Sequence, residues 1–269
     1  MISEFFNLPW PRIALLFGFF YLLFMFIAWI YADRMLFPFP EPKTYTQNDV
    51  DFFVSTKTGL QIACIQESAK KPNGLIILYS HGNGEDLGML RDRMRKLTQS
   101  GCDVFAYDYP GYGLSEGTPS EEGCYQAIDA LYAHILEQTG KKASDVVIWG
   151  RSLGTGPSCY LASKIKVAGL LLETPFLSAF RTITEITVLP WDRFRNLQRV
   201  ALVKSPSLVI HGRWDEVIPF RQGRRIHNEL PEPKTFLEIK EASHNDLVEK
   251  GGQSYKESIK HFLSGLLDD

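Results

Sequence analysis

The sequence WGRSLGTG at residues 149–156 follows the apolar run DVVIWG (145–150) and sets Ser152 between Gly150 and Gly154. A sharp turn from a strand into a helix strains its central residue and crowds the backbone on both sides, and glycines relieve that crowding. Such a turn would lift the serine hydroxyl above the sheet edge, at a helix start whose amides face an anion. We interpret the stretch as a nucleophile elbow; an ordinary glycine-rich strand–helix turn is the alternative.

The chain around this stretch alternates short β-rich runs with helical stretches from about residue 50. A hairpin is predicted from DFFVST and LQIACIQ, and further strands at 74–80, 102–108, 145–150, 167–173, 207–212 and 235–240. Helices are predicted at 86–99, at 120–138 and after the last strand. This alternation indicates βαβ units, and hence an α/β fold with a mostly parallel central sheet flanked by helices.

A short cap is expected at about 176–204, where the sequence provides for only one or two short helices. Four large apolar residues are expected to line a comparatively open site or to form the core of the cap: Phe176, Leu177, Trp191 and Phe194.

Composition excludes several classes of protein. The 269 residues are 45% hydrophobic and 22% charged, which is ordinary for a globular chain. A net charge of −2 disfavours nucleic acid as a partner, since nucleic acid normally requires a basic excess. The four cysteines are widely spaced without a C-x-x-C pair, so no metal site is expected. No G-x-G-x-x-G follows the first parallel strand, which disfavours a dinucleotide cofactor.

The N-terminal region departs from this ordinary composition. Residues 13–32, IALLFGFFYLLFMFIAWIYA, carry no charge, and as a helix they would span about 30 Å, the thickness of a bilayer's hydrocarbon core. A cleaved signal peptide would have a shorter apolar core and a small-residue cleavage site. We therefore predict a single-pass transmembrane anchor in contact with membrane lipid. The expected organisation is a flank at 1–12, the anchor at 13–32, a spacer at 33–49 stiffened by Pro38, Pro40 and Pro42, and a folded domain at 50–269.

A serine hydroxyl needs a base with a pKa near 7, which points to histidine. His244, in EASHNDL, follows the last predicted strand in a polar loop and is the preferred base. His211 ends a strand and is expected to line the sheet edge without reaching the chemistry. Three other histidines fall in predicted helices and are expected to be solvated or packed: His134, His227 and His261.

The imidazole in turn needs a carboxylate that fixes its tautomer and stabilises its charged form. Asp215, in IHGRWDEVIP, lies in the loop after a strand, 29 residues before His244. The chain order Ser, Asp, His is the order found in α/β-hydrolases. Glu173, at the end of the preceding strand, is the competing acid, and a salt bridge or helix cap is the structural alternative for each.

A tetrahedral intermediate also needs donors for its oxyanion. The amide of Leu153, directly after Ser152, is one expected donor. The second is expected from SHGNGED (80–86), with the amide of Asn83 preferred and the flanking glycines allowing close approach of substrate. A plain turn rich in glycine and asparagine is the alternative.

Five motifs in this order carry a resemblance: YSHGNGEDLGML, YDYPGYGLSEGTPS, WGRSLGTGP, VIHGRWDEVIPF and ASHNDL. Together they look like the motif set of the α/β-hydrolase-fold serine hydrolases, and most like the subgroup that includes eukaryotic protein depalmitoylases and their bacterial relatives. The likeness runs from about residue 50 to 267.

The resemblance implies esterase or thioesterase chemistry through an acyl-enzyme, with Ser152, Asp215 and His244 as triad and no cofactor. It supports Asn83 and Leu153 as the backbone oxyanion hole, and it implies a small-molecule or lipid-linked ester or thioester substrate. The depalmitoylases carry a cysteine-rich, lipid-modified N-terminus, whereas this chain has an apolar helix and no cysteine before Cys64. A peptidase or amidase on the same fold and a non-catalytic membrane interaction protein are the alternatives.

Overall fold

The computed structural model describes residues 9–37, 43–184 and 188–267. The chain divides into two compact units, Met1–Phe37 and Pro38–Asp269, and each is described by itself. In its described part the first unit is the helix α2 (Pro9–Leu36). Its stretch Trp10–Leu36 contains an 18-residue window with a mean hydropathy of 2.5 and is long and apolar enough to cross a membrane. It contains the expected anchor and is a candidate membrane span; Pro38, Pro40 and Pro42 of the expected spacer lie outside the described residues.

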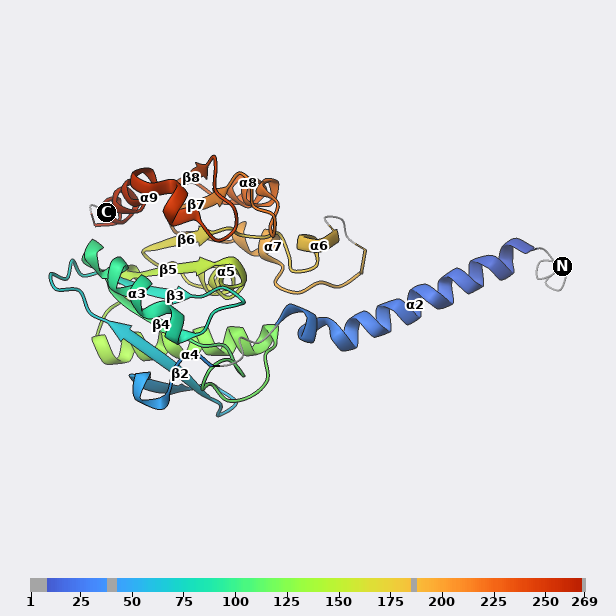
Figure 1. Ribbon diagram of the computed structural model, residues 1–269, viewed down its shortest axis with the longest axis horizontal. Helices are drawn as coiled ribbons and strands as arrows, with labels where there is room; N and C mark the ends of the chain where they lie inside the picture. Colours follow the sequence, from blue (N-terminus) through green and yellow to red (C-terminus); the bar gives the residue numbers. More distant parts are fainter. Residues whose placement is uncertain (1–8, 38–42, 185–187, 268–269) are drawn as a thin grey trace. The chain divides into compact units, whose positions relative to one another are not determined.

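The described residues of the second unit form an eight-stranded sheet in the order β1-β2-β4-β3-β5-β6-β7-β8, and Figure 1 shows the labelled strands β2 to β8 stacked in this order. The strands are β1 (Phe52–Ser55), β2 (Gln61–Glu67), β3 (Ile76–Ser80), β4 (Asp103–Tyr107), β5 (Val146–Arg151), β6 (Gly169–Glu173), β7 (Ser207–Gly212) and β8 (Lys234–Ile239). The pairs β1–β2 and β2–β4 are antiparallel and the others are parallel. The prediction of a mostly parallel sheet is confirmed.

Four strands in the middle of the sheet are buried along their whole length: β3, β5, β6 and β7. This explains why their sequences are nearly continuous apolar runs, without the alternation of apolar and polar residues that a half-exposed strand shows. The helices of this unit are α3 (Leu87–Leu97), α4 (Glu121–Thr139), α5 (Thr155–Lys164), α6 (Arg181–Thr184), α7 (Asn196–Val200), α8 (Phe220–Glu229) and α9 (Leu247–Gly265). Short 3₁₀ turns are η1 (Gln47–Asp49), η2 (Thr98–Ser100), η3 (Ala143–Asp145) and η4 (Ser152–Gly154).

Helices α3 and α9 contribute to one hydrophobic core on a single face of the sheet. Leu90 and Met94 of α3, and Ile259 and Leu263 of α9, pack there with strand residues such as Trp149. Helices α4, α5 and α8 contact the strands but add no residue to this cluster, because they cover the opposite face. The sheet is therefore covered on both faces, as the sequence predicts.

The cap between β6 and β7 contains only the short helices α6 and α7 in its described part. Phe176 and Phe194 are buried and pack edge to face, and the Phe194 ring leaves no room for a side chain at Gly156. These two aromatics are thus cap core rather than site lining.

Residues 44 and 45 fall in the expected spacer but pack on the second unit. The Thr44 amide donates to Asp86 Oδ2 at 2.8 Å, and the buried Tyr45 hydroxyl donates to the Asp108 carboxylate. Asp86 is the residue before α3. The second unit therefore includes these residues, ahead of position 50.

Candidate active site

Ser152 occupies a strained turn at the carboxyl end of β5. Its φ of +51° is in the left-handed region, which a residue with a side chain adopts only at a cost of roughly 1–2 kcal/mol. A Cβ at Gly150 would lie 2.5 Å from the carbonyl oxygen of Gly154, and one at Gly154 would lie 2.0 Å from that of Ser80. Both flanking positions therefore require glycine, and the turn leads directly into η4 and α5.

His244 lies between Ser152 and Asp215. Its Nε2 is 3.0 Å from Ser152 Oγ, and its Nδ1 is 2.9 Å from Asp215 Oδ2 and 3.1 Å from Oδ1. An ionised carboxylate only accepts hydrogen bonds, so Nδ1 donates to Asp215 and the unprotonated Nε2 accepts from the serine hydroxyl. The three residues thus form one hydrogen-bonded chain, with the serine oriented for loss of its proton.

Asp215 is buried and held as an anion. Its Oδ1 accepts the amides of Val217 and Ile218 at 2.9 and 2.7 Å, and His211 Nε2 is 3.3 Å from Oδ2. Burial opposes ionisation, but the hydrogen bonds from His211 and His244 outweigh it and hold the pKa of Asp215 well below its ordinary value. The carboxylate is therefore charged across the physiological range of pH.

His211 corrects an expectation from the sequence. It was expected to remain away from the chemistry, yet its ring contacts the Asp215 carboxylate, and its Nε2 also lies 2.9 Å from the Ile218 carbonyl oxygen. The tight turn after β7 folds Asp215 back over the end of its own strand, which brings the two side chains together. No spacing rule for a triad identifies this partner.

Glu173, the competing acid, is positioned elsewhere. It is buried at the end of β6, where its carboxylate accepts from the Tyr255 hydroxyl of α9. Glu216, next to Asp215, accepts the backbone amide of His244 at 3.4 Å and so contacts the histidine loop rather than the imidazole.

The loop after β3 carries Asn83 and touches the turn that carries Leu153. The backbone of Ser80 and His81 lies against Gly154, at the distances that exclude a Cβ there. The Tyr112 hydroxyl, from the loop after β4, donates to Asn83 Oδ1 at 2.6 Å. Leu153 is in the first turn of the helical segment, where backbone amides have no partner within the helix.

A buried histidine–aspartate pair joins the start of this loop to the end of β4. His81 Nε2 is 3.2 Å from Asp108 Oδ1, and both side chains are fully buried. Burial disfavours the charged imidazole, but Asp108 outweighs that penalty and raises the pKa of His81. Tyr45 donates to the same carboxylate. The segment at 44–45 is therefore connected, through Asp108, to His81 in the loop after β3.

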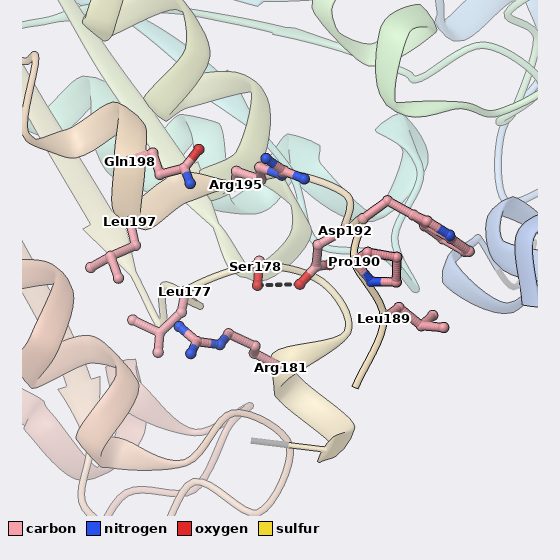
Figure 2. Close-up of a pocket in the computed structure, with 10 residues that line it drawn as sticks. Leu177, Ser178, Arg181, Leu189, Pro190, Asp192, Arg195, Leu197 and Gln198 are labelled. Atoms are coloured by element: carbon pink, nitrogen blue, oxygen red, sulfur yellow. Dashed lines mark hydrogen bonds between the residues drawn. The ribbon is translucent and has the colours of Figure 1, made fainter. Parts of the chain in front are cut away.

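A cavity of about 270 Å³ opens in the cap, and Figure 2 shows its lining side chains. It is lined by Leu177, Ser178, Arg181, Leu189, Pro190, Trp191, Asp192, Arg195, Leu197 and Gln198. Two of the four residues expected to line the site, Leu177 and Trp191, are among them, and none of the triad candidates is. The Ser178 hydroxyl donates to Asp192 at 2.5 Å, between Arg181 and Arg195.

Hydrogen bonds link Asn196, which lies in sequence between the lining residues Arg195 and Leu197, to the nucleophile turn. Asn196 Nδ2 donates to the Phe176 carbonyl at 3.2 Å and lies 3.5 Å from Thr155 Oγ1, which itself donates to the Ser152 carbonyl at 2.7 Å. The cap segment that contributes Arg195 and Leu197 to the cavity is therefore in contact with the elbow through Asn196. Among the described residues, no group of three or more His, Cys, Asp and Glu side chains could hold a metal ion.

A family model described as the alpha/beta hydrolase fold matches residues 76–201. Alpha/beta hydrolase domain-containing protein 17B of Homo sapiens is 36% identical over 216 residues, covering 79% of this chain and 74% of that protein. The 17C protein of Mus musculus is 34% identical over 227 residues, covering 82% and 70%.

Solved structures agree on the fold. The esterase Pf2001 of Pyrococcus furiosus has a TM-score of 0.68 at 15% identity, covering 83% of this chain and 96% of that chain. The monoacylglycerol lipase of Paleococcus ferrophilus has a TM-score of 0.60 at 21% identity, covering 76% and 99%. The chain therefore belongs to the family of the α/β-hydrolase domain-containing proteins 17B and 17C, and it is an enzyme of the hydrolase type.

Proposed function

We propose that the protein is a membrane-anchored serine hydrolase that cleaves carboxylic ester or thioester bonds through an acyl-enzyme. The observation that carries the proposal is the hydrogen-bonded chain Ser152–His244–Asp215, with the serine in a strained turn at the carboxyl end of β5. A buried serine bonded to a histidine whose other nitrogen faces an ionised carboxylate is the arrangement that activates a hydroxyl.

In the first half of the reaction Ser152 Oγ attacks the substrate carbonyl while His244 Nε2 takes the hydroxyl proton. Asp215 holds Nδ1 and stabilises the imidazolium that forms. Collapse of the tetrahedral intermediate breaks the bond to the alkoxide or thiolate, which receives the proton from His244. Water then repeats the sequence on the acyl-enzyme and releases the acid, so His244 serves first as base and then as acid in each half.

The negative charge on the carbonyl oxygen is assigned to the backbone amides of Leu153 and Asn83. Leu153 lies in the first turn of a helical segment, where amides have no partner within the helix and the helix dipole favours an anion. Asn83 is on the loop packed against that same turn, and Tyr112 fixes its side chain. Losing one such donor typically costs about 10²–10³ in kcat.

Substitution of Ser152 tests the proposal. Ser152→Ala is expected to abolish covalent labelling by a fluorophosphonate probe and to lower kcat for a soluble ester by several powers of ten. Ser163→Ala is the matched control, because Ser163 lies in α5 and its hydroxyl donates to the Tyr160 carbonyl of its own helix. Retention of labelling in Ser152→Ala, or activity within tenfold of the wild type, rejects Ser152 as the nucleophile.

The anchor role rests on the apolar stretch Trp10–Leu36, and it favours substrates presented at a membrane. Removing residues 1–34 should leave hydrolysis of a water-soluble ester almost unchanged, because the candidate site lies wholly in the second unit. Hydrolysis of an acyl ester embedded in lipid vesicles should fall sharply, since an anchor raises the enzyme's effective concentration at the bilayer. Equal loss on both substrates would assign the helix a structural role instead.

A further inference from the structure

Arg151 is the last residue of β5 and the one before Ser152, and it is buried with only 7% of its surface exposed. Side chains alternate along a strand, so Arg151 points to the same face as Trp149, the face covered by α3 and α9. An arginine stays charged at all accessible pH values, so its burial requires partners.

The two ends of the guanidinium fork contact two different loops. Nη1 is 3.0 Å from Glu85 Oε2, in the loop that carries Asn83. Nη2 donates to Asn245 Oδ1 at 2.8 Å, and Asn245 directly follows His244. Because Arg151 is itself covalently joined to Ser152, one side chain connects the nucleophile turn, the loop after β3 and the histidine loop.

The Glu85 arm continues into the backbone of its loop. Glu85 Oε2 also accepts the amide of Gly82 at 2.8 Å. A Cβ at Gly82 would lie 2.9 Å from both Arg151 Nη1 and Glu85 Oε2, so the loop closes tightly around this ion pair. Burial opposes ionisation of Glu85, but Arg151 and then Arg93 outweigh it and lower the pKa of that carboxyl.

We propose that Arg151 is a positioning residue. It holds the loop after β3 (81–86), which carries Asn83, and the loop after β8 (240–246), which carries His244, in their positions relative to Ser152. This inference rests on the proposed function. The side chain contacts neither the triad side chains nor the proposed oxyanion amides among the contacts described, so it acts through Glu85 and Asn245. A guanidinium is planar and has two donor ends, so it can bind Glu85 and Asn245 at the same time. An ammonium is a single point charge and cannot hold both in this geometry.

The test compares three variants of the full-length protein in detergent, with kcat and KM for a water-soluble p-nitrophenyl ester. Arg151→Met should lower kcat by about 10²-fold, because a misplacement of about 1 Å in a catalytic constellation costs roughly that much. KM should stay within threefold, since Arg151 does not contact substrate. Arg151→Lys should recover part of the rate, to about tenfold below the wild type, because an ammonium can hold one arm but not both.

Arg93→Met is the matched control. Arg93 also pairs with Glu85, at 3.6 Å, but it comes from α3 and its other partner is the Tyr79 hydroxyl. The kcat of Arg93→Met should stay within threefold of the wild-type value, even if its melting temperature drops by as much as that of Arg151→Met. Equal loss of kcat in Arg93→Met and Arg151→Met, or kcat within threefold in Arg151→Met, overturns the proposal.

If Arg151→Met does not fold, Glu85→Gln and Asn245→Ala each remove one arm. Each should lower kcat by about tenfold with KM within threefold, and full kcat in both overturns the proposal. Failure of the proposed function is distinguished by the probe. Fluorophosphonate labelling that does not depend on Ser152 rejects the nucleophile, whereas Ser152-dependent labelling with unchanged rates in the Arg151 variants rejects only the positioning role.

Discussion

Replacing Gly154 with alanine should separate the two walls of the proposed oxyanion hole. The added Cβ would lie 2.0 Å from the Ser80 carbonyl oxygen and 2.7 Å from that of His81, whereas real Cβ contacts essentially never fall below 3.0 Å. The backbones must therefore part by at least 3.0 − 2.0 = 1.0 Å. One wall carries Leu153 and the other leads to Asn83, so we expect kcat to fall by about 10²–10³.

The assay is kcat for a water-soluble ester, together with the melting temperature. Overpacking of this kind costs roughly 1–3 kcal/mol, so a modest drop in melting temperature accompanies the loss of rate. Gly169→Ala is the control, because its Cβ would crowd the ends of the Leu266 and Phe262 side chains at the opposite edge of the sheet. It should lower stability but keep kcat within threefold. A kcat above one tenth of the wild-type value in Gly154→Ala would refute the reasoning.

Asp215→Asn should lower kcat by about 10³–10⁴ by leaving His244 without its orienting carboxylate, while Glu173→Gln should cost far less because Glu173 bonds Tyr255; the opposite ranking in steady-state kinetics would move the acid to β6. Acid stability should follow the same carboxylate. A folded-state pKa below the unfolded value of about 3.9 stabilises the protein above that pH, and this contribution is lost as pH falls further. The gap in melting temperature between wild type and Asp215→Asn, measured by scanning fluorimetry, should therefore narrow from pH 5 to pH 3, and a gap that widens contradicts the pKa assignment.

The fold was predictable because its signals are local. Each buried strand is a short apolar run between turn residues, and each covering helix follows at the spacing of a βαβ unit. The candidate triad was predictable for the same reason, since Ser152, Asp215 and His244 each follow the end of a strand. The sequence indicates each strand and the residue where it ends. Because the strands are parallel, their carboxyl ends, and the residues that follow them, lie at the same edge of the sheet.

The supporting contacts were not predictable, because they join side chains through the folded structure. Arg151 meets Glu85 and Asn245 across separations of 66 and 94 residues, and no spacing rule marks such a pair. Tyr45 reads as part of a proline-rich spacer, yet it is buried against Asp108. His211 reads as a strand end, and only the path of the turn after β7 brings Asp215 back to it.

Strand register explains why such long-range contacts form at all. Ser80 pairs with Gly150 and Gly150 pairs with Leu172, so β3, β5 and β6 finish at nearly the same level. The loops that leave them are then forced to share one small volume above the sheet edge. Glycine at 154 allows the backbone of the nucleophile turn to contact the backbone of Ser80 and His81. The Arg151 guanidinium, one residue before Ser152, contacts Glu85 and Asn245 on the face of the sheet that α3 and α9 cover. The strain at Ser152 is held in place because its neighbours on both sides are fixed by contacts to other strands' loops, which is how a turn with a φ of +51° persists.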